Sequence, residues 1–92
     1  MRSETVAFIE PGIVAHVRIR VRRRGVLLAG VSGHGLDTLP RLIEEVAAKV
    51  AVDRWEIEVN AFQAFVLQHA PTIEVCGRLG ITLEPRHTVR SA

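Results

Sequence analysis

The clearest pattern in the chain is the alternation of apolar and polar residues over positions 13–22. A period of two predicts a β-strand with one apolar face on a core and one polar face, here a basic one, on the other side. Residues 26–31 are apolar at nearly every position, which predicts a second strand covered on both faces. Residues 22–25 would join the two strands as a hairpin.

Shorter patterns predict the rest of the sheet. Residues 5–9 and 55–59 each predict a strand, and residues 72–76 and 81–84 predict a final hairpin. A tight turn is expected after the first strand, because Pro11 presets φ and Gly12 accepts a positive φ at the next position.

Two helices are predicted. Residues 38–50 show apolar residues at steps of three and four, which is typical of a helix lying on a core, and Asp37 is expected to cap its first turn. The apolar stripe consists of Leu39, Leu42, Ile43, Val46, Ala47 and Val50. Asn60 and Gln63 resemble a capping box that would begin a short helix over residues 61–69, although a strand is an alternative reading of this segment.

These elements predict a single two-layer α+β domain over residues 1–92, in the approximate order β-β-β-α-β-α-β-β. The sheet would be mainly antiparallel, with one long and one short helix on one face, and residues 85–92 would form a flexible tail. A hydrophobic content of 48% and a charged content of 24% suit such a globular domain.

The cysteine content and the lengths of the apolar runs indicate the cellular location to be expected. The chain contains one Cys, which excludes an intramolecular disulfide framework and suits a reducing compartment. Its first residues show no secretory apolar region, and its longest apolar run, residues 26–31, is too short to span a bilayer. We therefore expect a cytoplasmic protein with no membrane partner.

A basic stripe is the first candidate binding surface. Six residues of the first predicted hairpin could contact phosphates: His16, Arg18, Arg20, Arg22, Arg23 and Arg24. Arginine forks suit phosphate oxygens, so the stripe supports an RNA- or DNA-binding hypothesis for residues 16–24. The alternative is that Glu56 and Glu58 pair with these arginines from a neighbouring strand. Stacking aromatics are not evident, because Phe8, Trp55, Phe62 and Phe65 all occupy core-like positions.

Two further motifs are weaker evidence of a binding or reactive site than the basic stripe. Gly30, Gly33 and Gly35 predict a loop before the long helix that could hold an anion, but their order matches no nucleotide fingerprint. Cys76 could approach His34, His69 or His87, but these spacings match no common metal or nucleophile motif. The sequence therefore predicts no catalytic residue, no cofactor and no metal site, and an enzymatic reaction cannot be named from it.

An excess of apolar residues is the last candidate feature. The second hairpin strand and the short helix offer more apolar surface than a 92-residue chain easily covers, which indicates an interface. The interface residues expected are Leu27, Ala29, Phe65 and Leu67. The favoured hypothesis is a small non-enzymatic binding or adaptor domain that acts through protein contacts. Its partner would be a second copy of the chain, in a homo-oligomer, or another protein. Nucleic-acid binding is the alternative hypothesis.

Overall fold

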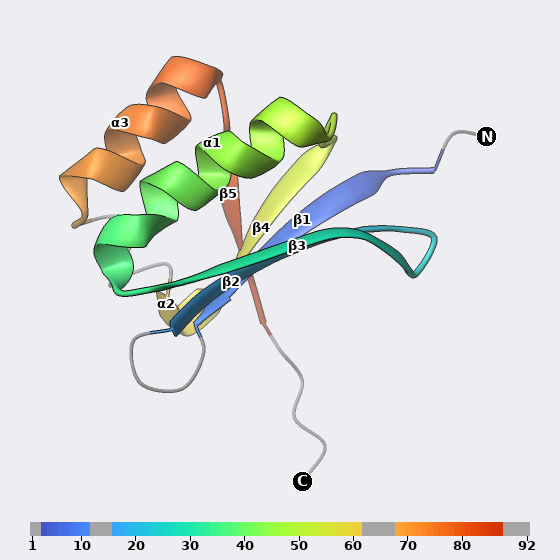
Figure 1. Cartoon of the computed structure of the whole chain (residues 1–92), viewed down its shortest axis with the longest axis horizontal. Helices are drawn as coiled ribbons and strands as arrows, with labels where there is room; N and C mark the ends of the chain where they lie inside the picture. Colours follow the sequence, from blue (N-terminus) through green and yellow to red (C-terminus); the bar gives the residue numbers. More distant parts are fainter. Residues whose placement is uncertain (1–2, 12–15, 62–67, 88–92) are drawn as a thin grey trace, which may run out of the picture.

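A computed structural model describes residues 3–11, 16–61 and 68–87 of the chain. The sheet has five strands in the spatial order β3-β2-β1-β4-β5. The strands are β1 (Thr5–Pro11), β2 (His16–Arg23), β3 (Val26–His34), β4 (Arg54–Glu58) and β5 (Leu83–Arg86). The helical elements are the 3₁₀ turn η1 (Leu36–Thr38), α1 (Leu39–Lys49), the short α2 (Val59–Ala61) and α3 (Ala70–Leu79). The predicted α+β class is confirmed, and α1 and α3 lie on one face of the sheet (Figure 1). Residues 62–67 of the short helix predicted over residues 61–69 lie outside the described residues.

The sheet combines two kinds of pairing. Strand β2 pairs antiparallel with both β1 and β3, and these are the longer ladders. Strand β4 pairs parallel with both β1 and β5. Because β4 and β5 run the same way, the chain needs a crossover between them, and α3 lies in that connection. Strands β3 and β5 therefore form the two edges of the sheet.

The β2–β3 hairpin follows directly from its turn residues. Arg24 has φ 53° and Gly25 has φ 75°. Two consecutive residues with positive φ make the type of two-residue turn that matches the right-handed twist of the flanking strands. The predicted turn around Pro11 and Gly12 falls mostly outside the described residues.

The core lies between the sheet and the two helices. Alternate residues of the strands and the predicted stripe of α1 are buried, since one face of each element meets the other layer. The buried apolar residues are Ala7, Ile9, Val17, Ile19, Val21, Leu39, Leu42, Ile43, Val46, Trp55, Ile57, Val75, Cys76 and Leu83. Of the stripe predicted for residues 38–50, Ala47 is exposed and Val50 is half-buried.

The predicted final hairpin is wrong in its first strand, because residues 70–79 form α3. The β-branched residues Thr72, Ile73 and Val75 favour a strand by propensity, but Thr72, Val75 and Cys76 are buried at helical spacing. Pro71 stands in the first turn, where a proline costs no hydrogen bond. Gly80, with φ 68°, ends the helix, and the amide of Ile81 donates to the Cys76 carbonyl at 2.8 Å. Strand β5 continues to Arg86, past position 85, where the tail was expected to begin.

The predicted glycine loop is also wrong. Gly30 and Gly33 belong to β3, which continues to His34, and only Gly35 of the three has a positive φ, 82°. Asp37 is not a helix cap: it lies in η1, and α1 begins after Thr38 without a side-chain cap. The Thr38 hydroxyl instead donates to the Gly35 carbonyl at 2.7 Å, which holds the tight connection between β3 and α1.

Candidate protein interface

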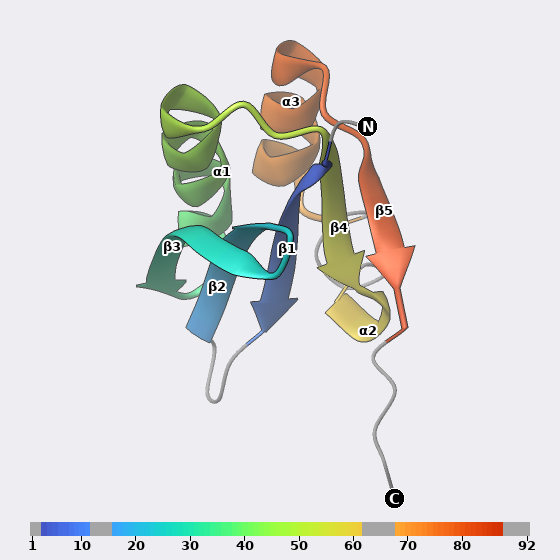
Figure 2. The ribbon, with the colours of Figure 1, turned by 90° about the vertical axis from the view of Figure 1, so that its right-hand side faces the viewer.

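The face of the sheet opposite the core carries the basic stripe. In β2, Arg18, Arg20 and Arg22 alternate with buried residues, and in the described part of the chain α1 and α3 lie on the other side of the sheet (Figure 2). We call this surface the open face. On it, Arg18 lies opposite Glu10, and Arg20 lies opposite Phe8.

The alternative in which Glu56 and Glu58 pair with the stripe does not occur, because β1 lies between β2 and β4. The carboxylate that reaches the stripe is Glu10, whose Oε1 lies 3.6 Å from Arg18 Nε and 3.4 Å from Arg20 Nη1. Glu56 instead contacts Arg54 at 3.3 Å and Arg86 at 3.2 Å. A single carboxylate, that of Glu10, therefore lies beside two arginines of the stripe, and Glu56 pairs with arginines outside the stripe.

The sequence position of Phe8 suggested a core residue, but Phe8 does not lie in the core. It lies half-buried on the open face, opposite Arg20 on one side and Glu56 on the other. The guanidinium carbon of Arg86 stands 5.2 Å from the centre of its ring, in a cation–π contact. The open face therefore has an aromatic side chain at its centre, although its ring already has a cationic partner.

The arginines at the end of the hairpin are less neutralised. Arg23 Nε donates to the Thr5 hydroxyl at 2.9 Å, and Arg24 Nε donates to the Ser3 hydroxyl. Among the described residues, Arg22 has no hydrogen-bond or ion-pair partner. At the opposite end of the same two strands, the rings of His16 and His34 meet edge to face, with centroids 4.2 Å apart.

Strand β3 exposes apolar side chains. Val26 is 60% exposed, Leu27 54% and Leu28 42%; we call these three residues the apolar tip. The expectation that this strand is covered on both faces is wrong, because α1 and α3 lie on one face of the sheet (Figure 2). A register shift near Arg22 also interrupts the pairing of β3 beside the apolar tip. Of the predicted interface residues, Leu27 belongs to the apolar tip and Ala29 packs against the core; Phe65 and Leu67 lie outside the described residues.

The two edges of the sheet differ in how they are protected. Residues 26–34, which form β3, contain no Pro, Lys, Arg, Asp or Glu. Strand β5 has four residues, among them Glu84, Pro85 and Arg86. Proline, charge and short length are the devices by which an edge strand resists pairing with another chain. Strand β5 has all three, whereas β3 has none of these three and only the register shift near Arg22, so β3 is the less protected edge.

The other predicted motifs do not come together as a reactive site. Cys76 is buried in α3, and burial raises the pKa of its thiol, which disfavours the reactive thiolate. His69 immediately precedes α3. Its Nδ1 lies 2.7 Å from Thr72 Oγ1 and its Nε2 lies 3.1 Å from Asp37 Oδ1, so the ring joins η1 to the start of α3.

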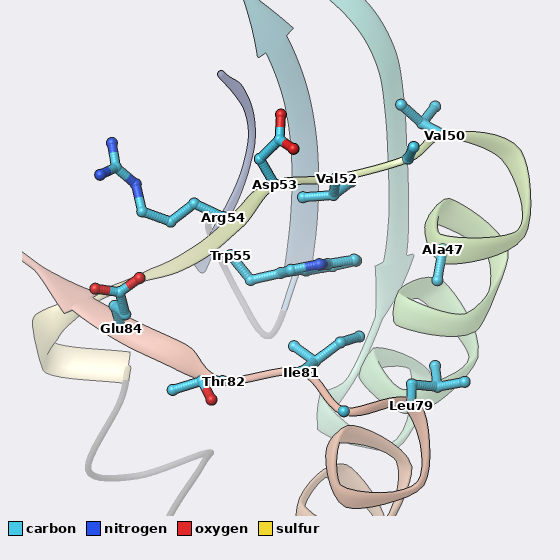
Figure 3. A pocket seen from close by; sticks show the side chains of 12 residues that line it. Ala47, Val50, Val52, Asp53, Arg54, Trp55, Leu79, Ile81, Thr82 and Glu84 are labelled. Carbon is cyan, nitrogen blue, oxygen red and sulfur yellow. The ribbon is translucent and has the colours of Figure 1, made fainter. Parts of the chain in front are cut away.

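A pocket of about 520 Å³ opens where the ends of α1 and α3 meet the start of β4 (Figure 3). Trp55 forms its floor, and its polar rim includes Asp53 and Arg54. Asp53 Oδ2 accepts a hydrogen bond from the Thr5 amide at 2.8 Å, and Arg54 Nη2 lies 3.3 Å from Glu4 Oε1. The rim groups therefore hold β4 against β1 and do not converge on a ligand.

Within residues 3–11, 16–61 and 68–87, no three His, Cys, Asp or Glu side chains are grouped so that they could hold a metal ion. No helix in the same part of the chain is long and apolar enough to cross a membrane. Comparison of the chain with protein-family models, curated proteins and solved structures gave no match. The β3 edge with its apolar tip is accordingly the surface from which a function can be argued.

Proposed function

We propose that this protein is a small non-enzymatic binding domain that acts through protein contacts and associates with itself through β3. The observation that supports the proposal is the apolar tip, three adjacent large side chains that are 42–60% exposed on an edge strand without a charge or a proline. Apolar groups exposed together are typical of interaction surfaces, and an unprotected edge strand offers backbone groups to a second chain.

The test is the dependence of mass on concentration, measured by sedimentation from the micromolar to the millimolar range. We expect the intact chain to associate, and Leu27→Asp to weaken that association. Leu27 is 54% exposed, so covering the rest of its side chain contributes about 1 kcal/mol per copy, or about 2 kcal/mol in a symmetric dimer, which is about 30-fold in Kd.

Ile73→Asp is the matched control. Ile73 lies on α3 and is 48% exposed, but it is remote from β3 in the sheet order. The same change of chemistry at this position should leave the association unchanged. A chain that stays monomeric over the whole range and captures no partner protein would refute the proposal.

Nucleic-acid binding is the second candidate, and Arg22 is the observation that favours it. This arginine has no partner among the described residues and stands beside two arginines that meet only hydroxyl groups. A fluorescence titration with RNA at low salt should then show binding that weakens steeply with added salt, and Arg22→Ala should reduce it.

Arg78→Ala removes the same charge from α3, where Arg78 contacts Glu44 at 3.0 Å, and serves as the control. Equal losses in the two variants would show that only the net charge matters. The absence of binding at low salt would exclude this candidate function.

A further inference from the structure

We propose that two copies of the chain pair their β3 strands antiparallel about a two-fold axis that passes through the sheet at Val31. The two five-stranded sheets would then continue into one, with the helices of both copies on the same face. This inference rests on the proposed self-association and specifies its geometry.

The residues along β3 permit this pairing. In antiparallel strands, residues directly opposite each other share a face, so an axis at Val31 places Ala29 opposite the partner's Gly33 and Gly30 opposite the partner's Ser32. These are small side chains, which allow two backbones to approach. The same register brings the apolar tip alongside the partner's Leu36, a half-buried apolar residue that packs on the core. Of the apolar tip, Val26 stands opposite the partner's Leu36 in this register, and Leu27 and Leu28 stand opposite the partner's Gly35 and His34.

The position of α1 also fits the pairing. This helix contacts both β2 and β3 (Figure 2), so its axis lies over the gap between them. With neighbouring strands about 4.8 Å apart, two such helices on either side of a β3–β3 seam would be separated by about 10 Å. Packed helices are separated by about 8–10 Å. The two copies of α1 would therefore lie against each other across the axis.

The charges on α1 are complementary in this arrangement. Arg78 Nη2 lies 3.0 Å from Glu44 Oε2, so Glu44 marks the flank of α1 that faces α3. At 100° per residue, Arg41 and Glu45 are turned about 60° and about 100° away from Glu44 around the helix, in the direction of the β3 edge. Arg41 has no ion-pair partner in the described ranges, whereas Glu45 Oε1 lies 3.6 Å from Lys49 Nζ of its own helix, an exposed contact that the partner's Arg41 would share. When two copies of the helix run antiparallel with the axis near Ile43, Arg41 of each copy faces the partner's Glu45.

A charge exchange tests the helix contact by sedimentation. Because the pair occurs twice in a symmetric dimer, Arg41→Glu alone and Glu45→Arg alone should each weaken the dimer about tenfold or more, and the double variant should restore it. The equivalent exchange of Glu44 and Arg78, on the flank facing α3, is the control and should leave the dimer unchanged.

Dipolar EPR tests the sheet geometry. Nitroxide labels at Ser32, in a Cys76→Ala background, should lie within about 20 Å of each other in the dimer. Labels at Glu84, on the outer edge strands, should lie about 40 Å apart, because nine strand spacings separate them. A dimer that is unaffected by the Arg41 and Glu45 exchange, or whose Glu84 labels lie much closer, would overturn this geometry and leave self-association standing. A chain that is monomeric at all concentrations would refute both.

Discussion

Gly33→Ala is the substitution that tests most directly how β3 is held to the rest of the fold. A Cβ built at Gly33 would lie 2.8 Å from Thr38 Oγ1 and 3.0 Å from Thr38 Cβ. Carbon atoms do not come so close in folded proteins, so either η1 must move away from β3 or the Thr38 side chain must turn. Turning it would break the hydrogen bond from its hydroxyl to the Gly35 carbonyl, which is 2.7 Å long.

The size of the effect follows from these two routes of relief. Forcing an extra methyl group into a packed contact costs about 1–3 kcal/mol, and giving up the hydrogen bond costs about 1 kcal/mol. The routes are alternatives, so their costs do not add. Replacing glycine in a strand also recovers about 0.5–1 kcal/mol of backbone entropy. The cheaper route sets the cost, so we expect Gly33→Ala to lower the free energy of unfolding by at most about 0.5 kcal/mol, and by about 1 kcal/mol relative to a glycine-to-alanine change in the strand that meets no atom.

Urea denaturation, followed by Trp55 fluorescence at low protein concentration, measures this loss without a contribution from association. With a slope of about 1–1.5 kcal/mol/M, the midpoint of Gly33→Ala should lie about 0.7–1 M below that of Gly30→Ala. Gly30→Ala is the control in the same strand, because a Cβ at Gly30 meets no atom within 4 Å; its midpoint should stay level or rise. Equal midpoints for the two variants would refute the packing of β3 against η1.

Two further predictions concern α3. Gly77→Ala should raise the free energy of unfolding by about 0.5–1 kcal/mol, because Gly77 lies inside the helix and a Cβ there meets no atom within 4 Å. Gly80→Ala should lower the free energy of unfolding by a similar amount, because φ is 68° at that position. A urea series on both variants gives the two signs, and a stabilising Gly80→Ala would contradict the end of α3. For Cys76, burial raises the thiol pKa in the folded state above its ordinary value of 9.0. The unfolded chain then loses the thiol proton first as the pH rises, so stability should be level below about pH 9 and fall above it. Cys76→Ala should remove that fall, and an identical pH dependence in the variant would show that the thiol is not its cause.

Periodic segments were predictable from the sequence alone. The alternation in β2, the stripe of α1 and the alternation in β4 each report that one face of the element is buried, whatever it packs against. The two-layer α+β class follows from these three segments. The elements predicted wrongly had conflicting local signals: α3 combines β-branched residues with helical spacing, and the glycines of β3 conceal a strand.

Local pattern could not assign the neighbours of each strand, and the candidate interface depends on them. Residues 26–28 are apolar in an edge strand as they would be in a central one, and only the strand order leaves them exposed. Phe8 lies among residues that are apolar on both faces of β1, so only its register with Arg20 and Glu56 places it on the open face. The same order puts Glu10, and not Glu56, beside the basic stripe. Strand order is set by contacts between residues far apart in the chain. A period of two or 3.6 residues reports only which face of one element is buried, so it does not identify those contacts.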